Sequence, residues 1–274
     1  MKIKILKLGS DPEVFIKDRV TGQHKSIGGL LGGTKDLPFP MDKEGFFFLE
    51  DGMAAEGNIA PASTPKEFSD NIEYLLTYIQ SIIPEKYELS IIPSADFVEE
   101  DLLTPQAQTV GCEPDFNAWT GQVNQKPDIS DKMFRSAGGH LHTSYENPNR
   151  KTSVNLIRLM ELYITLPLSI LDTDKRRMSL YGKSGAFRFK DYGFELRSPS
   201  NFWIKTDELR QWVFTQAELA VNHYNEKGGI SSTSPLAKAI QSAINDCNTE
   251  LAKELCTVNG IILPKIENQV MKKV

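Results

Sequence analysis

The segment Gly138-Gly139-His140-Leu141-His142-Thr143-Ser144 joins a glycine pair to the alternation of side chains that is typical of a β-strand. Because successive side chains of a strand point to opposite faces, His140 and His142 should share one face of the sheet. Two imidazoles on one face can ligate a metal or form a hydrogen-bonded polar pair. Which role applies depends on what the neighbouring strands place beside them.

Three other segments repeat this pattern of polar residues two positions apart. They are Asp11-Pro12-Glu13, Glu56-Gly57-Asn58 and Glu195-Leu196-Arg197. If the four strands lie side by side, one face gathers carboxylates, two imidazoles and a guanidinium. Buried like charges repel strongly, so such a cluster requires divalent cations.

The ligand types indicate which cation fits. Carboxylates with one or two imidazoles and no paired thiolates favour Mg²⁺ or Mn²⁺ over structural Zn²⁺. Each segment alone has a plainer interpretation, since Asp11-Pro12-Glu13 is typical of a turn entering a strand and Glu195-Leu196-Arg197 of a solvated strand face. The prediction of a metal site therefore depends on the combination.

Basic residues cluster near the same segments. Arg176-Arg177 precede Tyr181-Gly182-Lys183-Ser184-Gly185, Arg188 stands shortly before Glu195, and Arg135 precedes the glycine pair. Cations beside bound metals are what phosphoryl transfer requires. No GxxxxGK[ST] segment is present and no GxGxxG follows a strand, so ATP would bind outside the P-loop and Rossmann designs.

The rest of the chain predicts a mixture of strands and helices without a regular βαβ rhythm. The expected strands are Ile3–Leu6, Glu13–Lys17, Phe46–Glu50, Met53–Asn58, Glu88–Pro93, Gly138–Ser144, Gly185–Lys190 and Gly193–Ser198. The first expected helix begins at Thr64-Pro65. Three further helices are expected over Ser153–Leu171, Asp207–Tyr224 and Pro235–Cys256. This pattern predicts an α+β fold with a mainly antiparallel sheet, in one domain over residues 1–274.

Composition excludes several classes of protein. The 274 residues are 40% hydrophobic and 24% charged, which is typical of a globular chain, and the net charge of −5 gives no general affinity for nucleic acid. No segment is expected to span a membrane, and the N-terminus lacks a signal-peptide pattern. Three cysteines without CxxC spacing argue against disulfides and structural zinc, so a cytoplasmic location is expected.

Taken in order, the motifs resemble the phage-associated COOH–NH2 ligase family, type 2, a branch of the glutamine-synthetase-like amidoligases. The resemblance spans about residues 9–203. It is carried by Gly9-Ser10-Asp11-Pro12-Glu13, Gly111-Cys112-Glu113-Pro114-Asp115, Gly138-Gly139-His140-Leu141-His142, Tyr181-Gly182-Lys183-Ser184-Gly185-Ala186-Phe187-Arg188, Phe194-Glu195-Leu196-Arg197 and Asn201-Phe202-Trp203.

The resemblance implies a curved antiparallel sheet of the glutamine-synthetase catalytic type, with helices packed on its outer face. It also implies ATP-dependent activation of a carboxylate as an acyl phosphate, followed by attack of an amine, with Mg²⁺ or Mn²⁺ at two or three sites. The implied metal ligands are Asp11, Glu13, Glu56, His140 and Glu195. The implied nucleotide-binding residues are His142, Lys183, Arg188 and Arg197, of which Arg188 and Arg197 act in catalysis together with Glu56. If the protein is encoded by a phage, its location would be the host cytoplasm.

Two departures and two alternatives accompany this interpretation. The first triplet is Asp-Pro-Glu rather than Glu-x-Glu, and Asn58 is neutral where another acid is expected.

A metal-dependent hydrolase could use the same histidines and carboxylates, and a non-catalytic relative could retain nucleotide binding alone. The sequence does not identify the carboxylate, which could be a small molecule or a peptide, or the amine. It leaves open whether the protein is a homo-oligomer.

Overall fold

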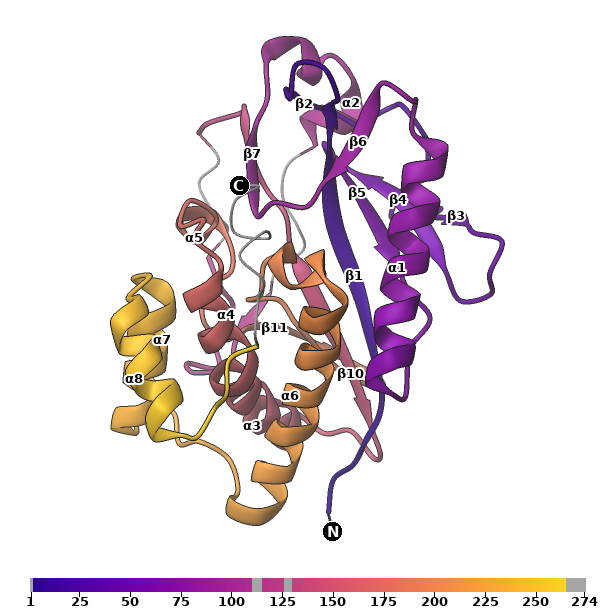
Figure 1. Ribbon diagram of the computed structural model, residues 1–274. Coiled ribbons are helices and arrows are strands. Elements are labelled where there is room, and N and C mark those ends of the chain that lie inside the picture. Colours follow the sequence, from indigo (N-terminus) through magenta and orange to yellow (C-terminus); the bar gives the residue numbers. More distant parts are fainter. Residues whose placement is uncertain (1, 110–114, 126–129, 265–274) are drawn as a thin grey trace.

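A ten-stranded sheet forms the centre of the computed structural model, which describes residues 2–109, 115–125 and 130–264 (Figure 1). Eight strands follow one another in the order β3-β4-β5-β1-β10-β12-β11-β8, while β2 and β6 pair with the far end of β1. The strands are β1 (Ile5–Asp18), β2 (His24–Lys25), β3 (Phe39–Pro40), β4 (Phe47–Asp51), β5 (Ala54–Asn58), β6 (Tyr87–Ser90), β8 (Phe116–Asn117), β10 (Gly139–Tyr145), β11 (Ala186–Lys190) and β12 (Gly193–Leu196). All their pairings are antiparallel, which confirms the predicted sheet type.

The N-terminal strand differs from its prediction. Instead of two strands joined by a loop, Ile5–Asp18 is one strand of 14 residues. Pro12 is accommodated because the strand changes partner there: it pairs with β10 up to Pro12 and with β5 from Glu13 onward. A proline without an N–H group is tolerated at the end of a ladder.

The strands expected at 46–50 and 53–58 pair as the hairpin β4–β5, and those expected at 185–190 and 193–198 pair as the hairpin β11–β12. The strand predicted at Glu88–Pro93 lies slightly earlier, as β6. A small second sheet pairs β7 (Ser94–Asp96) with β9 (Phe134–Ser136).

The long helices pack together beside the large sheet, and in Figure 1 α1 lies next to β1 and α6 next to β10. They are α1 (Pro65–Ile82), α3 (Arg150–Met160), α4 (Leu166–Leu171) and α6 (Asp207–Lys227). Thr64 caps α1 as predicted, by accepting a hydrogen bond from the Glu67 N–H. Leu141, between the two histidines of β10, is fully buried in the main core.

A π-helical turn at Glu161–Thr165 joins α3 to α4, so Arg150–Leu171 is continuous and begins earlier than expected, with Asn149 as its cap. By length and composition alone this stretch could cross a membrane, contrary to the prediction that no segment could. Most of its apolar window is buried inside the protein, and core helices commonly share this composition.

The last predicted helix is two helices, α7 (Pro235–Asn245) and α8 (Thr249–Val258). Cys247 between them has a positive φ of 51°, which a helix does not allow, and Asn248 caps α8. The short helices are α2 (Pro105–Gln108), α5 (Arg177–Leu180) and the 3₁₀ turns Glu99–Leu102 and Asn201–Lys205. The predicted motif residues Gly111–Pro114 lie outside the described residues.

Candidate active site

The register of the sheet places the polar triplets on adjacent strands, which is the condition that the predicted metal site required. On β1, Asp11 lies opposite His140 of β10, and Glu13 lies opposite Glu56 of β5. On the other side of β10, His142 lies opposite Glu195 of β12. Arg188 of β11 is also opposite Glu195. Five neighbouring strands therefore supply one polar face.

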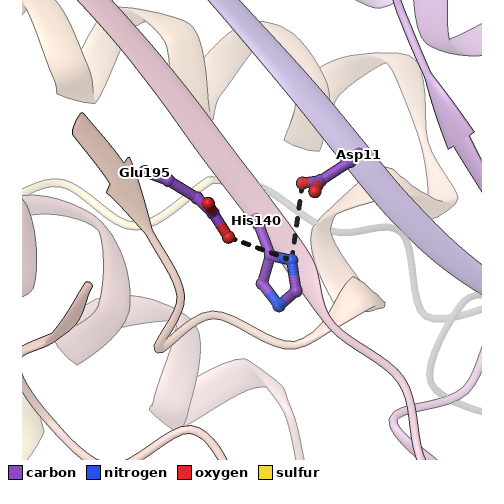
Figure 2. A group of neighbouring side chains, drawn as sticks. All are labelled: Asp11, His140 and Glu195. Carbon is purple, nitrogen blue, oxygen red and sulfur yellow. Dashed lines mark ion pairs between the residues drawn. The ribbon is translucent and has the colours of Figure 1, made fainter. Parts of the chain in front are cut away.

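Asp11, His140 and Glu195 form a first group, here called the histidine cluster, whose ligand atoms lie within 4.8 Å of one another (Figure 2). His140 Nδ1 is 3.4 Å from Asp11 Oδ1 and 3.9 Å from Glu195 Oε1. Asp11 Oδ1 and His140 Nδ1 are buried and make no hydrogen bond of good geometry within the described residues. Because buried polar atoms are costly without a partner, these atoms fit a bound cation.

Glu13, Asp51 and Glu56 form a second group, the carboxylate cluster, again with ligand atoms within 4.8 Å of one another. Glu13 Oε2 also accepts a hydrogen bond of 2.7 Å from the Gly138 N–H. The Lys35 ammonium lies 2.9 Å from Asp51 Oδ2. A group of three carboxylates with one lysine is a suitable oxygen site for a hard cation.

Asp51 was not among the predicted site residues, because it lies between the expected strands at 46–50 and 53–58, in the Asp51-Gly52 dipeptide that is typical of a tight turn. Asp51 pairs with Ala54 across the hairpin, and Ala54 and Glu56 share a face because they are two residues apart. A two-residue turn after Asp51 therefore predicts that the Asp51 and Glu56 side chains lie on the same face of the hairpin.

Three cations surround Glu195. Arg197 forms a close ion pair with Glu195 Oε1, Lys190 Nζ is 3.0 Å from Oε2, and Arg188 is 3.7 Å from Oε1. Arg197 also contacts Asp115 at 3.5 Å. Both clusters and these cations line one cavity of about 320 Å³.

The charges of the histidine cluster stabilise its ionised carboxylates. Burial and Asp11 act to raise the pKa of Glu195, but Arg197, His140 and His142 bring it down to about 2. Burial likewise acts to raise the pKa of Asp11, and the positive charges of His142 and His140 hold it well below its usual value. Both carboxylates are therefore ionised at neutral pH.

In the carboxylate cluster, by contrast, the surroundings oppose ionisation of Glu56. Burial raises the pKa of Glu56 well above its usual value, and the negative charges of Asp11, Glu13 and Asp51 raise it further. Without a cation, this cluster is therefore under electrostatic repulsion.

Seven of the nine predicted site residues line the cavity: Asp11, Glu13, Glu56, His140, Arg188, Glu195 and Arg197. His142 is not among the lining residues but contacts Asp11, with Nε2 and Oδ1 3.0 Å apart. Lys183 is exposed and does not line the cavity. The turn that carries it is held against α7, where Asn245 accepts the Ser184 N–H.

Several charged residues that line the cavity were not among the predicted site residues, although Asp115 and Arg135 stood in or beside motifs noted in the sequence. Lys35, Asp51, Arg177 and Lys190 all face the cavity. Arg177 was noted only as part of a basic run, and Lys190 could have been found from its position, since it is two residues after Arg188 on the same strand.

Residues 132–262 match the model of a known family, described as phage phiEco32-like COOH.NH2 ligase-type 2. The match covers just under half of the chain and includes His140, Arg188, Glu195 and Arg197, whereas the β1 and β5 carboxylates precede it. No curated protein matches the chain. Over residues 132–262, the resemblance inferred from the motifs is confirmed: this part of the chain is similar to the phage COOH–NH2 ligase type 2 family.

Proposed function

We propose that this protein is an ATP-dependent, metal-assisted ligase that joins a carboxylate to an amine through an acyl phosphate. The family's name implies the coarser part of this function, a ligation of carboxylate and amine. The observation that carries the finer part is the convergence of both clusters and three cations, Arg188, Lys190 and Arg197, on one cavity. Phosphoryl transfer requires this combination of metal ligands and cations.

The histidine cluster and the carboxylate cluster would each hold Mg²⁺ or Mn²⁺. Such cations would supply Lewis-acid stabilisation of phosphate oxygens. Glu56 is the residue for which a cation would matter most, because its ionisation is opposed by its neighbours. The buried polar atoms of Asp11 and His140 support this assignment for the other cluster.

Arg188 and Arg197 would bind the transferred phosphoryl group and offset its developing charge. Both line the cavity beside Glu195, with Lys190 as a further cation. Lys183 is left out of the proposed nucleotide site because its side chain is exposed away from the cavity. A small-molecule or peptide carboxylate and an amine would react in the same cavity. The protein would position these substrates and would not supply a covalent nucleophile.

We also propose that the sheet is of the glutamine-synthetase catalytic type and that the chain is one ligase domain. The antiparallel pairing supports the first part, as does the burial of Leu141, between the two histidines of β10, in the core that the helices share. The second is supported by strands from residues 5–18 and 193–196 lying in one sheet.

Calorimetric titration of ATP with Mn²⁺ tests this function. Wild-type protein should bind ATP saturably and only with the metal, and Arg188→Ala should weaken binding by about tenfold or more, since a hydrogen bond to a charged group contributes ~1.5–3 kcal/mol. Arg19→Ala is a matched control, because Arg19 pairs with Glu88 on an exposed surface. Its affinity should equal that of the wild type.

Absence of ATP binding at millimolar concentration would overturn the ligase mechanism. If Mn²⁺ alone still bound, a metal-dependent hydrolase would become the better hypothesis. If ATP bound but no carboxylate and amine pair gave ADP release, the non-catalytic alternative would gain support.

A further inference from the structure

Glu161 lies in the π-helical turn between α3 and α4, and the proposed reaction does not use it. Its side chain is fully buried, its Oε2 accepts a 2.9 Å hydrogen bond from the Ser184 hydroxyl, and its Oε1 is bonded to the Ser198 hydroxyl. A carboxyl group must be desolvated to be buried, whereas an apolar side chain at the same helical position would pack without that cost. A π-helical turn is also common at functional sites. Both features favour a functional role for Glu161.

The two serines flank the hairpin β11–β12. Ser184 stands two residues before β11, and Ser198 stands two residues after β12. Between them the Arg197 N–H donates a 2.9 Å hydrogen bond to the Ala186 carbonyl, which holds the two ends of the hairpin side by side. One carboxyl group on the helices therefore fastens both ends of the segment that carries the three cations of the cavity.

The hydroxyl groups of both serines direct their protons to Glu161. Trp119 Nε1 lies 3.0 Å from Ser184 Oγ, and an indole N–H group only donates, so the Ser184 proton is left for the carboxyl group. The Thr165 hydroxyl lies 2.9 Å from Ser198 Oγ and can donate to it in the same way. Burial raises the pKa of Glu161 to about 7, so above this pH the carboxylate accepts both hydroxyl protons.

Ser198 is held through its backbone as well. Arg177, which is buried and lines the cavity, donates a 2.8 Å hydrogen bond from Nη1 to the Ser198 carbonyl. Gly182 leaves room for this guanidinium, since a Cβ atom there would lie 2.0 Å from Arg177 Nη1. The residue next to Arg197 is therefore fixed from two sides, by Glu161 through its side chain and by Arg177 through its carbonyl.

We infer that Glu161 is a positioning residue, which holds Arg197 through Ser198 at the place where the arginine meets the transferred phosphoryl group. The inference rests on the role of Arg197 in the proposed function and extends that function to a residue that does not line the cavity. Arg197 forms ion pairs with Glu195 and with Asp115, and its backbone position sets where the guanidinium lies between them. Precision matters there, because a displacement of about 1 Å can reduce the rate of a reaction by ~10²-fold.

Calorimetric titration of ATP with Mn²⁺ at pH 8 into wild-type, Glu161→Gln and Ser198→Ala protein tests the inference. Each variant should bind ATP about three- to tenfold more weakly, because a displaced Arg197 keeps only part of a charged hydrogen bond whose full loss costs about tenfold or more. Ser198→Ala keeps the test decisive if Glu161→Gln does not fold. Ser69→Ala is a matched control, since Ser69 is a buried serine that donates a 2.6 Å hydrogen bond to Asp207. Its ATP affinity should equal that of the wild type.

A double-variant cycle separates positioning through Ser198 from independent effects. In the Glu161→Gln background, Ser198→Ala should reduce ATP affinity by less than about twofold further, because both substitutions act on the same contact. Equal losses in both backgrounds, or wild-type ATP affinity in both single variants, would overturn the positioning role.

The arginine side chain provides a readout that needs neither metal nor nucleotide. In ¹H–¹⁵N spectra of the ligand-free protein, the Arg197 Nε–H resonance should shift or broaden in Glu161→Gln and stay in place in Ser69→Ala. An unchanged resonance in Glu161→Gln would overturn the inference even if ATP binds. Wild-type protein that binds no ATP would instead contradict the proposed function, while the spectra alone would still decide whether Glu161 holds Arg197.

Discussion

The histidine cluster and the carboxylate cluster share one cavity but balance their charge differently. Around Glu195 the chain supplies its own cations, Arg188, Lys190 and Arg197. Around Glu56 the described residues supply one close ammonium, that of Lys35, which pairs with Asp51. The pKa of Glu195 accordingly falls to about 2, whereas that of Glu56 rises well above its usual value.

This difference indicates what each cluster requires of a metal. The charge of Glu195 is balanced without a metal, so removing this carboxylate takes away an anion that Arg188, Lys190 and Arg197 share. The carboxylate cluster repels itself, so removing one of its carboxylates relieves strain in the metal-free protein. Opposite effects of two carboxylate substitutions on stability would therefore support the comparison.

The largest effect is expected for Glu195→Ala. The substitution leaves Arg197, Lys190 and His140 around a buried gap, and removal of one partner from a buried ion pair costs about 3–5 kcal/mol. Urea unfolding of the metal-free protein measures this loss. Glu226→Ala, at an exposed position, is the control and should change stability by less than about 0.5 kcal/mol. A loss at Glu195 no larger than that of the control would contradict the charge balance described.

A third buried carboxyl, Glu161, sharpens the comparison because burial and hydrogen bonds, not neighbouring charges, are the main influences on its pKa among the described residues. It lies in the π-helical turn on the helix side and accepts hydrogen bonds from the Ser184 and Ser198 hydroxyls. Burial raises its pKa from 4.5 to about 7. Between these pH values the folded state holds a proton that the unfolded state has released, so its contribution to stability is present below about pH 4.5 and is lost as the pH rises through 7.

The wild type should therefore lose on the order of 3 kcal/mol relative to Glu161→Gln between pH 4.5 and pH 8, since each pKa unit corresponds to ~1.4 kcal/mol. Urea unfolding of both proteins across this range gives the difference, in which groups common to both cancel. A difference that stays constant with pH would show that Glu161 is ionised at the same pH in both states.

Sequence alone predicted the parts of this site that follow from strand alternation. The pairs Asp11 with Glu13 and His140 with His142 could be assigned to one face because side chains two apart in a strand share a face. Their adjacency depended on strand order, which the family resemblance suggested and the register of β1 and β10 establishes.

The missed features depend on long-range contacts or on local exceptions. Pro12 suggested a break in β1, but a change of partner strand accommodates it. Glu161 is hidden in an apolar helical run, where nothing local reveals that Ser184 and Ser198 will reach it. Lys183 lies near Arg188 in sequence, yet its side chain is exposed and does not line the cavity.

Glu56→Gln should have the opposite sign to Glu195→Ala. The amide keeps the shape but removes a charge that Glu13 and Asp51 oppose, so the metal-free protein should gain about 1 kcal/mol or more, given the cost of close like charges in a protein. The same variant should lose the part of the Mn²⁺ stabilisation that comes from the carboxylate cluster and keep the part that comes from the histidine cluster. Thermal unfolding with and without Mn²⁺ measures both. A destabilised metal-free variant would refute the repulsion in this cluster.

The smallest effect is expected at Lys35, whose side chain is about half exposed. Lys35→Ala removes the ammonium beside Asp51, and an exposed ion pair contributes only about 0.2–1 kcal/mol, so the metal-free protein should lose no more than that. Its Mn²⁺ affinity should rise a few-fold, because the lysine no longer competes with the cation for Asp51. Lys66→Ala, which breaks the exposed pair with Asp70, should cause a similar small loss without changing Mn²⁺ binding. Weaker Mn²⁺ binding in Lys35→Ala would mean that the lysine supports the metal site. It would contradict the view that the Lys35 ammonium competes with the cation for Asp51.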